Sequence, residues 1–145
     1  MSLSDAFLSN GRRIRKDHYI HLVQVAELDG KLDKGEMELL HKAGRRFGLT
    51  DVEIDALIDR EKDFHYVPPV SLAEKFDELY NMGLMALNDN ELSELEEKML
   101  KKYAIAAGFN DEQVEGVIKI VVDGIGRGDD EEALLKEYRS KFLRR

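Results

Sequence analysis

The sequence predicts an all-α protein of about seven helices in a single domain spanning residues 1–145. Three observations predict it. Apolar residues recur at the three- and four-residue spacing of helices, and few stretches alternate as strands do. The only two prolines are adjacent, at Pro68 and Pro69. Ser, Thr or Asp is repeatedly followed three residues later by Glu, the spacing of a helix-starting capping box. At 145 residues and 43% hydrophobic, the chain is large enough to bury a core.

The first half, about residues 13–62, predicts three helices. An apolar face over about 13–28 predicts the first helix, which carries Tyr19, Leu22, Val23 and Ala26. Gly30 is expected to end it in a left-handed turn. Asp33 and Glu36 have the spacing of a capping box for a second helix that stops at Gly48. Thr50 with Glu53 opens the third.

The second half, about residues 71–125, repeats these signals. HYVPPVSLAE forms an extended linker, and Ser71 with Glu74 then opens a helix through Leu87 that is apolar nearly all round. Gly83 in that helix would allow a neighbouring helix to approach closely. Ser93 with Glu96 then starts the next helix, which Gly108 ends, and Asn110 with Gln113 starts another. A glycine hinge at Gly124, Gly126 and Gly128 precedes a last amphipathic helix over about 129–143.

The two halves also match residue by residue. AELDGKLDKGEMELLHKAGRRFGLTD aligns without a gap with ALNDNELSELEEKMLKKYAIAAGFND. The alignment pairs Asp29 with Asp89, Glu36 with Glu96, and Gly48 with Gly108. Two copies are too few for a solenoid. We therefore expect two pseudo-symmetric helix-turn-helix repeats that superpose.

The shared acidic residues allow a structural and a metal-binding interpretation. The first copy resembles the second half of an EF-hand loop, but the first ligand position would fall on Val25, or on Met85 in the second copy, and neither side chain can bind calcium. Aspartates in the turns and glutamates in capping boxes explain most of the motif without a ligand. Symmetry could still bring four carboxylates to one surface. Asp29, Glu36, Asp89 and Glu96 are therefore the candidate metal ligands, and we expect at most weak divalent-cation binding.

The tandem pattern resembles the tellurite-resistance TerB family of small helical domains. In each copy the resemblance rests on an alanine-containing helix end, the Asp of the turn, an aliphatic residue and the following Glu. The copies then end in RRFGL and AAGF. The resemblance covers roughly residues 19–122. The resemblance implies a four-helix core, an association with tellurite and stress resistance, and divalent cations held by the shared acidic residues. It also implies the protein-interaction role that such domains have in co-chaperones. The second copy departs from the pattern at Asn88 and Asn90.

Composition narrows the partners and the compartment. A net charge of −8 argues against non-specific nucleic-acid binding. The absence of cysteine, of a secretory signal and of a long apolar run favours the cytoplasm and no membrane partner. The expected partner is another protein, as the resemblance to the TerB family implies.

These observations predict a non-enzymatic binding or adaptor domain. The alternatives are a metal-dependent hydrolase that uses the acidic cluster and a co-chaperone-type interaction module. His18 and His21 lie one helical turn apart, where a structural role is commoner than zinc binding. GIGRGDD follows a helix, which favours a loop over a phosphate site. No catalytic residue and no cofactor other than a divalent cation is predicted.

Overall fold

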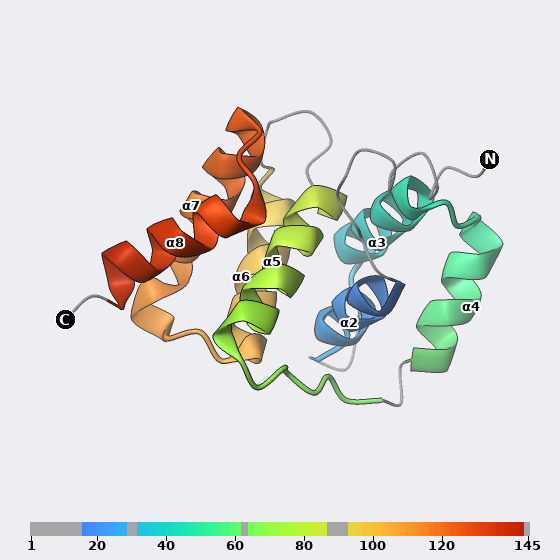
Figure 1. Cartoon of the computed structure of the whole chain (residues 1–145). Helices are drawn as coiled ribbons and strands as arrows, with labels where there is room; N and C mark the ends of the chain where they lie inside the picture. Colours follow the sequence, from blue (N-terminus) through green and yellow to red (C-terminus); the bar gives the residue numbers. More distant parts are fainter. Residues whose placement is uncertain (1–15, 29–31, 62–63, 87–92, 144–145) are drawn as a thin grey trace. The chain divides into compact units, whose positions relative to one another are not determined.

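The computed structural model describes residues 16–28, 32–61, 64–86 and 93–143. These residues form seven α-helices and one 3-10 turn and contain no strand, which confirms the all-α prediction (Figure 1). The helices are α2 Lys16–Ala26, α3 Lys34–Phe47, α4 Asp51–Glu61, α5 Leu72–Ala86, α6 Glu94–Ala107, α7 Val114–Arg127 and α8 Glu131–Phe142, with the 3-10 turn η1 at Asp111–Gln113.

The contacts between Cα atoms divide the chain into two units, Met1–Tyr66 and Val67–Arg145. The boundary lies in the extended linker that the adjacent prolines predict. Whether the two units act as one domain is not tested by this division, so the expectation of a single domain stays a prediction.

The first unit contains α2, α3 and α4, each of which contacts the other two. Its fully buried side chains include Tyr19, Leu22, Leu40 and Ile54. Gly44 of α3 allows close packing, because a Cβ atom there would lie 2.6 Å from Ile54 Cδ1 and 2.8 Å from the Tyr19 hydroxyl oxygen. Ile54 and Tyr19 come from α4 and α2, so a glycine at this position lets α3 approach both helices.

The second unit packs α5, α6 and α7 against one another, and α8 lies on α5 and α7. Gly83 of α5 faces α7, where a Cβ atom would lie 2.9 Å from Ile125 Cδ1, which confirms the predicted close approach. Tyr138 of α8 is 2% exposed and packs its ring near those of Phe76 and Phe109. This aromatic group joins α8 to the rest of the unit.

The predicted ends of α3 and α6 are confirmed, whereas the predicted ends at Gly30 and Leu87 lie outside the described residues. α3 and α6 are offset by sixty residues at both ends, as the sequence repeat is. Both stop at a left-handed glycine, Gly48 with φ 104° and Gly108 with φ 94°. Both also have the predicted capping boxes. The helices therefore begin and end in register with the repeat, while the superposition of the two complete repeats stays a prediction.

The predicted glycine hinge is wrong in part. α7 continues through Gly124 and Gly126 to Arg127, and only Gly128 leaves the helix, with φ 81°. Gly124 is buried against Leu134 of α8. The packing of α8 over this turn of α7 outweighs the low helix propensity of glycine.

Candidate functional site

The two predicted glutamates are helix caps. Glu36 accepts a hydrogen bond from the backbone N–H of Asp33 at 3.2 Å, and the Asp33 carboxylate accepts one from the Glu36 N–H at 2.7 Å. Glu96 and Ser93 make the same reciprocal pair at 2.9 and 3.1 Å. Glu36 is 5% exposed and Glu96 is 4% exposed. Each therefore satisfies a backbone donor that a helix start would otherwise leave unpaired.

The predicted four-carboxylate site stays a prediction. Asp29 and Asp89 lie outside the described residues, and Glu36 and Glu96 belong to different units. In the part of the chain that the structure describes, no group of three or more His, Asp or Glu side chains could hold a metal ion.

His18 and His21 pack among aromatic rings. His18 is 3% exposed, and its ring centroid lies 6.5 Å from that of His21. The His21 ring meets the ring of Tyr66 edge-on at 5.3 Å. This packing agrees with the structural interpretation of the two histidines.

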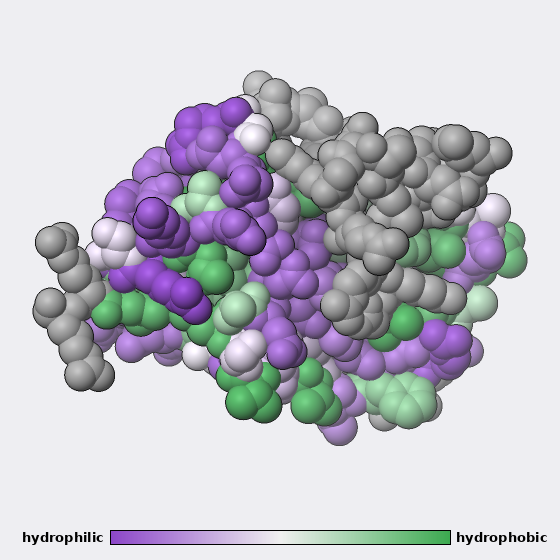
Figure 2. Space-filling view, in the orientation of Figure 1, coloured by the Kyte–Doolittle hydropathy of each residue, from purple (hydrophilic) through white to green (hydrophobic). Residues whose placement is uncertain are grey.

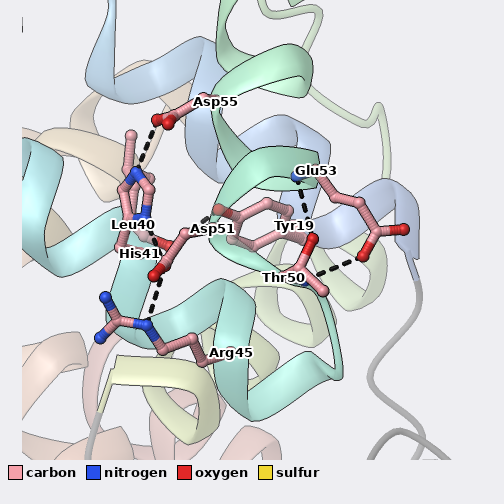
Figure 3. A network of polar contacts seen from close by, with 8 residues as sticks. All are labelled: Tyr19, Leu40, His41, Arg45, Thr50, Asp51, Glu53 and Asp55. Carbon is pink, nitrogen blue, oxygen red and sulfur yellow. Dashed lines mark hydrogen bonds and ion pairs between the residues drawn. The ribbon is translucent and has the colours of Figure 1, made fainter.

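A cluster of charged side chains lies between α3 and α4 in the first unit (Figure 3). His41 Nδ1 lies 2.7 Å from an Asp51 carboxylate oxygen, and His41 Nε2 lies 2.8 Å from an Asp55 carboxylate oxygen. Arg45 Nε donates to the same Asp51 oxygen at 2.9 Å. We call His41, Arg45, Asp51 and Asp55 the histidine clamp.

The geometry of the clamp favours the protonated imidazole. Burial works against the charge, but hydrogen bonds to Asp51 and Asp55 and the negative charges of both outweigh it and raise the pKa of His41 above its usual 6.5. The pKa of Asp51 is lowered by its hydrogen bonds with His41 and Arg45. An imidazolium donates from both ring nitrogens, so each carboxylate receives a proton-bearing partner.

The clamp lies over a buried phenol. Tyr19 of α2 donates its hydroxyl proton to the Leu40 backbone oxygen at 2.7 Å. Burial, and secondly the negative charge of Asp55, raise the pKa of Tyr19, so it stays a neutral hydrogen-bond donor. The clamp and this bond together join α2, α3 and α4. Because both nitrogens of His41 face carboxylates, the arrangement suits holding a proton and not removing one from a substrate.

The clamp was missed from the sequence, although a signal was present. His41 and Arg45 lie four residues apart on α3, and Asp51 and Asp55 lie four residues apart on α4. Residues at that spacing share one helix face. A turn as short as residues 48–50 makes consecutive helices neighbours. The two pairs of opposite charge could therefore have been expected to meet.

An acidic pair joins α5 to α8 in the second unit. Burial, a hydrogen bond to Asp77 and the negative charges of Asp77 and Glu132 raise the pKa of Glu131 to about 8. Asn81 Nδ2 also donates to Asp77, at 3.3 Å. The carboxyl of Glu131 is therefore protonated at neutral pH and donates to Asp77, as two close carboxyl groups require.

The second unit also carries a groove of about 310 Å³ along α6 and α7. It is lined by Glu97, Glu115, Ile118, Lys119, Val122 and Asp123. Lys101 bridges Glu97 and Glu115 at 3.2 Å each, and Lys119 pairs with Asp123 at 3.1 Å. A second hollow, of about 200 Å³, shares Lys119 and Asp123 and continues towards α8. The groove thus combines two apolar side chains, Ile118 and Val122, with charged side chains that form ion pairs with one another.

Comparison of the chain with protein-family models, with curated proteins and with solved structures gives no match. The resemblance to the TerB family therefore stays a prediction. Among the described residues, no helix has both the length and the apolar character that crossing a bilayer requires.

Proposed function

We propose that this protein is a non-enzymatic binding or adaptor domain of the TerB-like type, whose partner is another protein. The observation that carries the proposal is the groove along α6 and α7. Val122, half-buried, offers apolar surface between ion-paired side chains. Partner side chains can cover that surface, and the charges around it can contribute to orientation.

The charges of the groove support binding more than catalysis. The carboxylates of Glu97 and Glu115 both point to Lys101, whose pKa is raised by these two hydrogen bonds. A general base would need a carboxylate directed at a reacting group. The TerB-like part of the proposal is supported by α3 and α6, which share bounds, capping boxes and stop glycines at the spacing of the sequence repeat.

The test is capture of partners by the 145-residue chain with matched surface variants. Val122→Lys places a charge in the groove, whereas Ile105→Lys places one on an apolar residue of α6 that is 57% exposed and does not line the groove. We expect a cross-linked partner to be lost with Val122→Lys and retained with Ile105→Lys, with both variants folded by circular dichroism. If Val122→Lys captures the same partners as the wild type, the groove is not the binding site. Absence of any partner for the wild-type chain would overturn the adaptor function.

A further inference from the structure

The linker between α4 and α5 exposes large apolar side chains at every third residue. Phe64 is 59% exposed, Val67 is 76% exposed and Val70 is 97% exposed. Figure 2 shows hydrophobic side chains along the lower edge of the molecule, where Figure 1 draws this linker. Isolated exposed apolar residues are ordinary, but three within seven residues form a continuous apolar segment.

The exposure of the other linker residues follows the same period. Tyr66 is buried and Pro69 is half-buried, whereas His65 and Pro68 are exposed. A period of three is that of the polyproline II helix, in which residues three apart lie on one edge. Pro68 and Pro69 fix their own φ angles near the value of this helix, and each proline biases the residue before it to the same region. Residues 65–69 belong to no helix or strand.

Each end of the segment is held by the unit to which it belongs. The Tyr66 ring packs edge-on against His21 in the first unit. In the second unit, the Ser71 hydroxyl accepts a hydrogen bond from the Glu74 N–H at the start of α5, at 3.1 Å. A segment stiffened by two prolines loses less conformational entropy when it binds.

We propose that Phe64–Val70 is a recognition segment for a partner domain with an aromatic-lined groove of the kind that binds proline-containing segments. Such grooves take the polyproline II conformation and contact the side chains along one edge. Val67 and Val70 supply that edge, and the exposed Pro68 supplies a ring that can stack on an aromatic side chain. Addition to the edge of a β-sheet fits less well, because two consecutive residues without an N–H cannot continue a ladder. This inference rests on the proposed protein-binding function and names the partner class.

The experiment titrates the 145-residue chain against purified SH3, WW and EVH1 domains by calorimetry. We expect at least one class to bind. The double variant Pro68→Ala/Pro69→Ala should abolish the signal, and Val67→Ala or Val70→Ala should weaken it about tenfold, as the loss of buried apolar surface predicts. Val52→Ala is the matched control, because Val52 is also a valine with 78% exposure but lies on α4. It should bind as the wild type does.

Several results would overturn the inference. The first is that none of the three domain classes binds. The second is that the double proline variant still binds. The third is that Val52→Ala weakens binding as much as Val67→Ala or Val70→Ala does. Self-association of the chain that depends on Val67 and Val70, measured by sedimentation equilibrium, would assign the segment to a second copy instead. A cross-linked partner that is insensitive to the proline variants but lost with Val122→Lys would leave the adaptor function standing without this segment.

Discussion

His41 holds a proton between two carboxylates, so its contribution to stability depends on pH. Its pKa in the folded protein is raised above the usual 6.5, and the stabilisation is therefore full below that value and lost as the pH rises through the folded pKa. The pKa of Asp51 is lowered below its usual 3.8, so its stabilisation is present above that value and lost as the pH falls through the folded pKa. Both contributions are complete between about pH 4 and pH 6.5.

The first prediction is that His41→Gln lowers the Tm most within this window. The difference between the variant and the wild type should shrink as the pH rises through the folded pKa of His41, above which the imidazole is neutral in both the folded and the unfolded chain. The measurement is thermal unfolding across the pH range. His65→Gln is the control, since His65 is exposed and lies in the linker. A His41→Gln deficit that is constant with pH would show that the clamp contributes by packing alone.

The capping box of α6 gives the second prediction, because its two hydrogen bonds satisfy backbone donors at a helix start. Ser93→Ala should lower the free energy of unfolding by about 0.5–2 kcal/mol, the usual loss for a removed N-cap. Ser93→Asp should restore most of it, since an aspartate can accept the same hydrogen bond and Asp33 does so in α3. Urea unfolding measures both variants. If Ser93→Ala equals the wild type, the cap carries no net stability.

At the scale of elements, the packing of α8 on α7 depends on the missing side chain of Gly124. A Cβ atom there would overlap the side chain of Leu134, which is fully buried. The third prediction is that Gly124→Ala lowers the free energy of unfolding by about 1–3 kcal/mol, as overpacking does. Gly126→Ala in the same helix meets no atom within 4 Å and should instead raise it by about 0.5–1 kcal/mol. Chemical denaturation of both variants tests the pair, and a destabilised Gly126→Ala would contradict the packing argument.

The contact between α5 and α8 gives the fourth prediction. The folded pKa of Glu131 is about 8, above its ordinary 4.5, so its contribution to stability is full below pH 4.5 and lost as the pH rises through 8. Glu131→Gln keeps a polar side chain but cannot ionise. As the pH rises from about 5 to about 9, the free energy of unfolding of Glu131→Gln should therefore fall less than that of the wild type.

Glu132→Gln provides the comparison for Glu131→Gln. It changes a neighbouring glutamate in the first turn of α8 in the same way, and Glu132 acts on Glu131 only through its charge, the last of the causes that raise the pKa. Glu132→Gln should change the pH dependence of the free energy of unfolding in the same direction as Glu131→Gln, but by a smaller amount. Parallel stability profiles for the wild type and Glu131→Gln would show that the carboxyl titrates normally.

For the whole molecule, the open question is whether the acidic residues of the repeat bind a cation. One carboxylate oxygen each of Glu36 and Glu96 accepts a backbone hydrogen bond, so few oxygens remain for a cation that takes six to eight. The fifth prediction is that calorimetric titration with calcium, magnesium, manganese or zinc gives no micromolar stoichiometric signal. Asp29→Ala should lower stability by about 0.5–2 kcal/mol whether or not metal is added. A tight signal that Asp29→Ala or Asp89→Ala abolishes would make the cation site the leading function.

The helical class, the linker and the ends of α3 and α6 could be predicted from the amino-acid sequence alone. These features depend on residues three or four apart, such as Asp33 with Glu36 and Ser93 with Glu96, whose hydrogen bonds form within one turn of chain. The candidate site was predictable only in part. The glutamates were assigned correctly to caps, while Asp29 and Asp89 lie outside the described residues.

Only the tertiary structure decided which titratable groups are unusual and where α7 ends. His41 meets Asp51 and Asp55 across two helices, and Glu131 meets Asp77 across more than fifty residues of chain. The same holds for Gly124, whose place inside α7 depends on Leu134 of α8. A pKa shift or a close contact depends on distances between groups that folding brings together, and local sequence patterns set only the helices on which those groups lie.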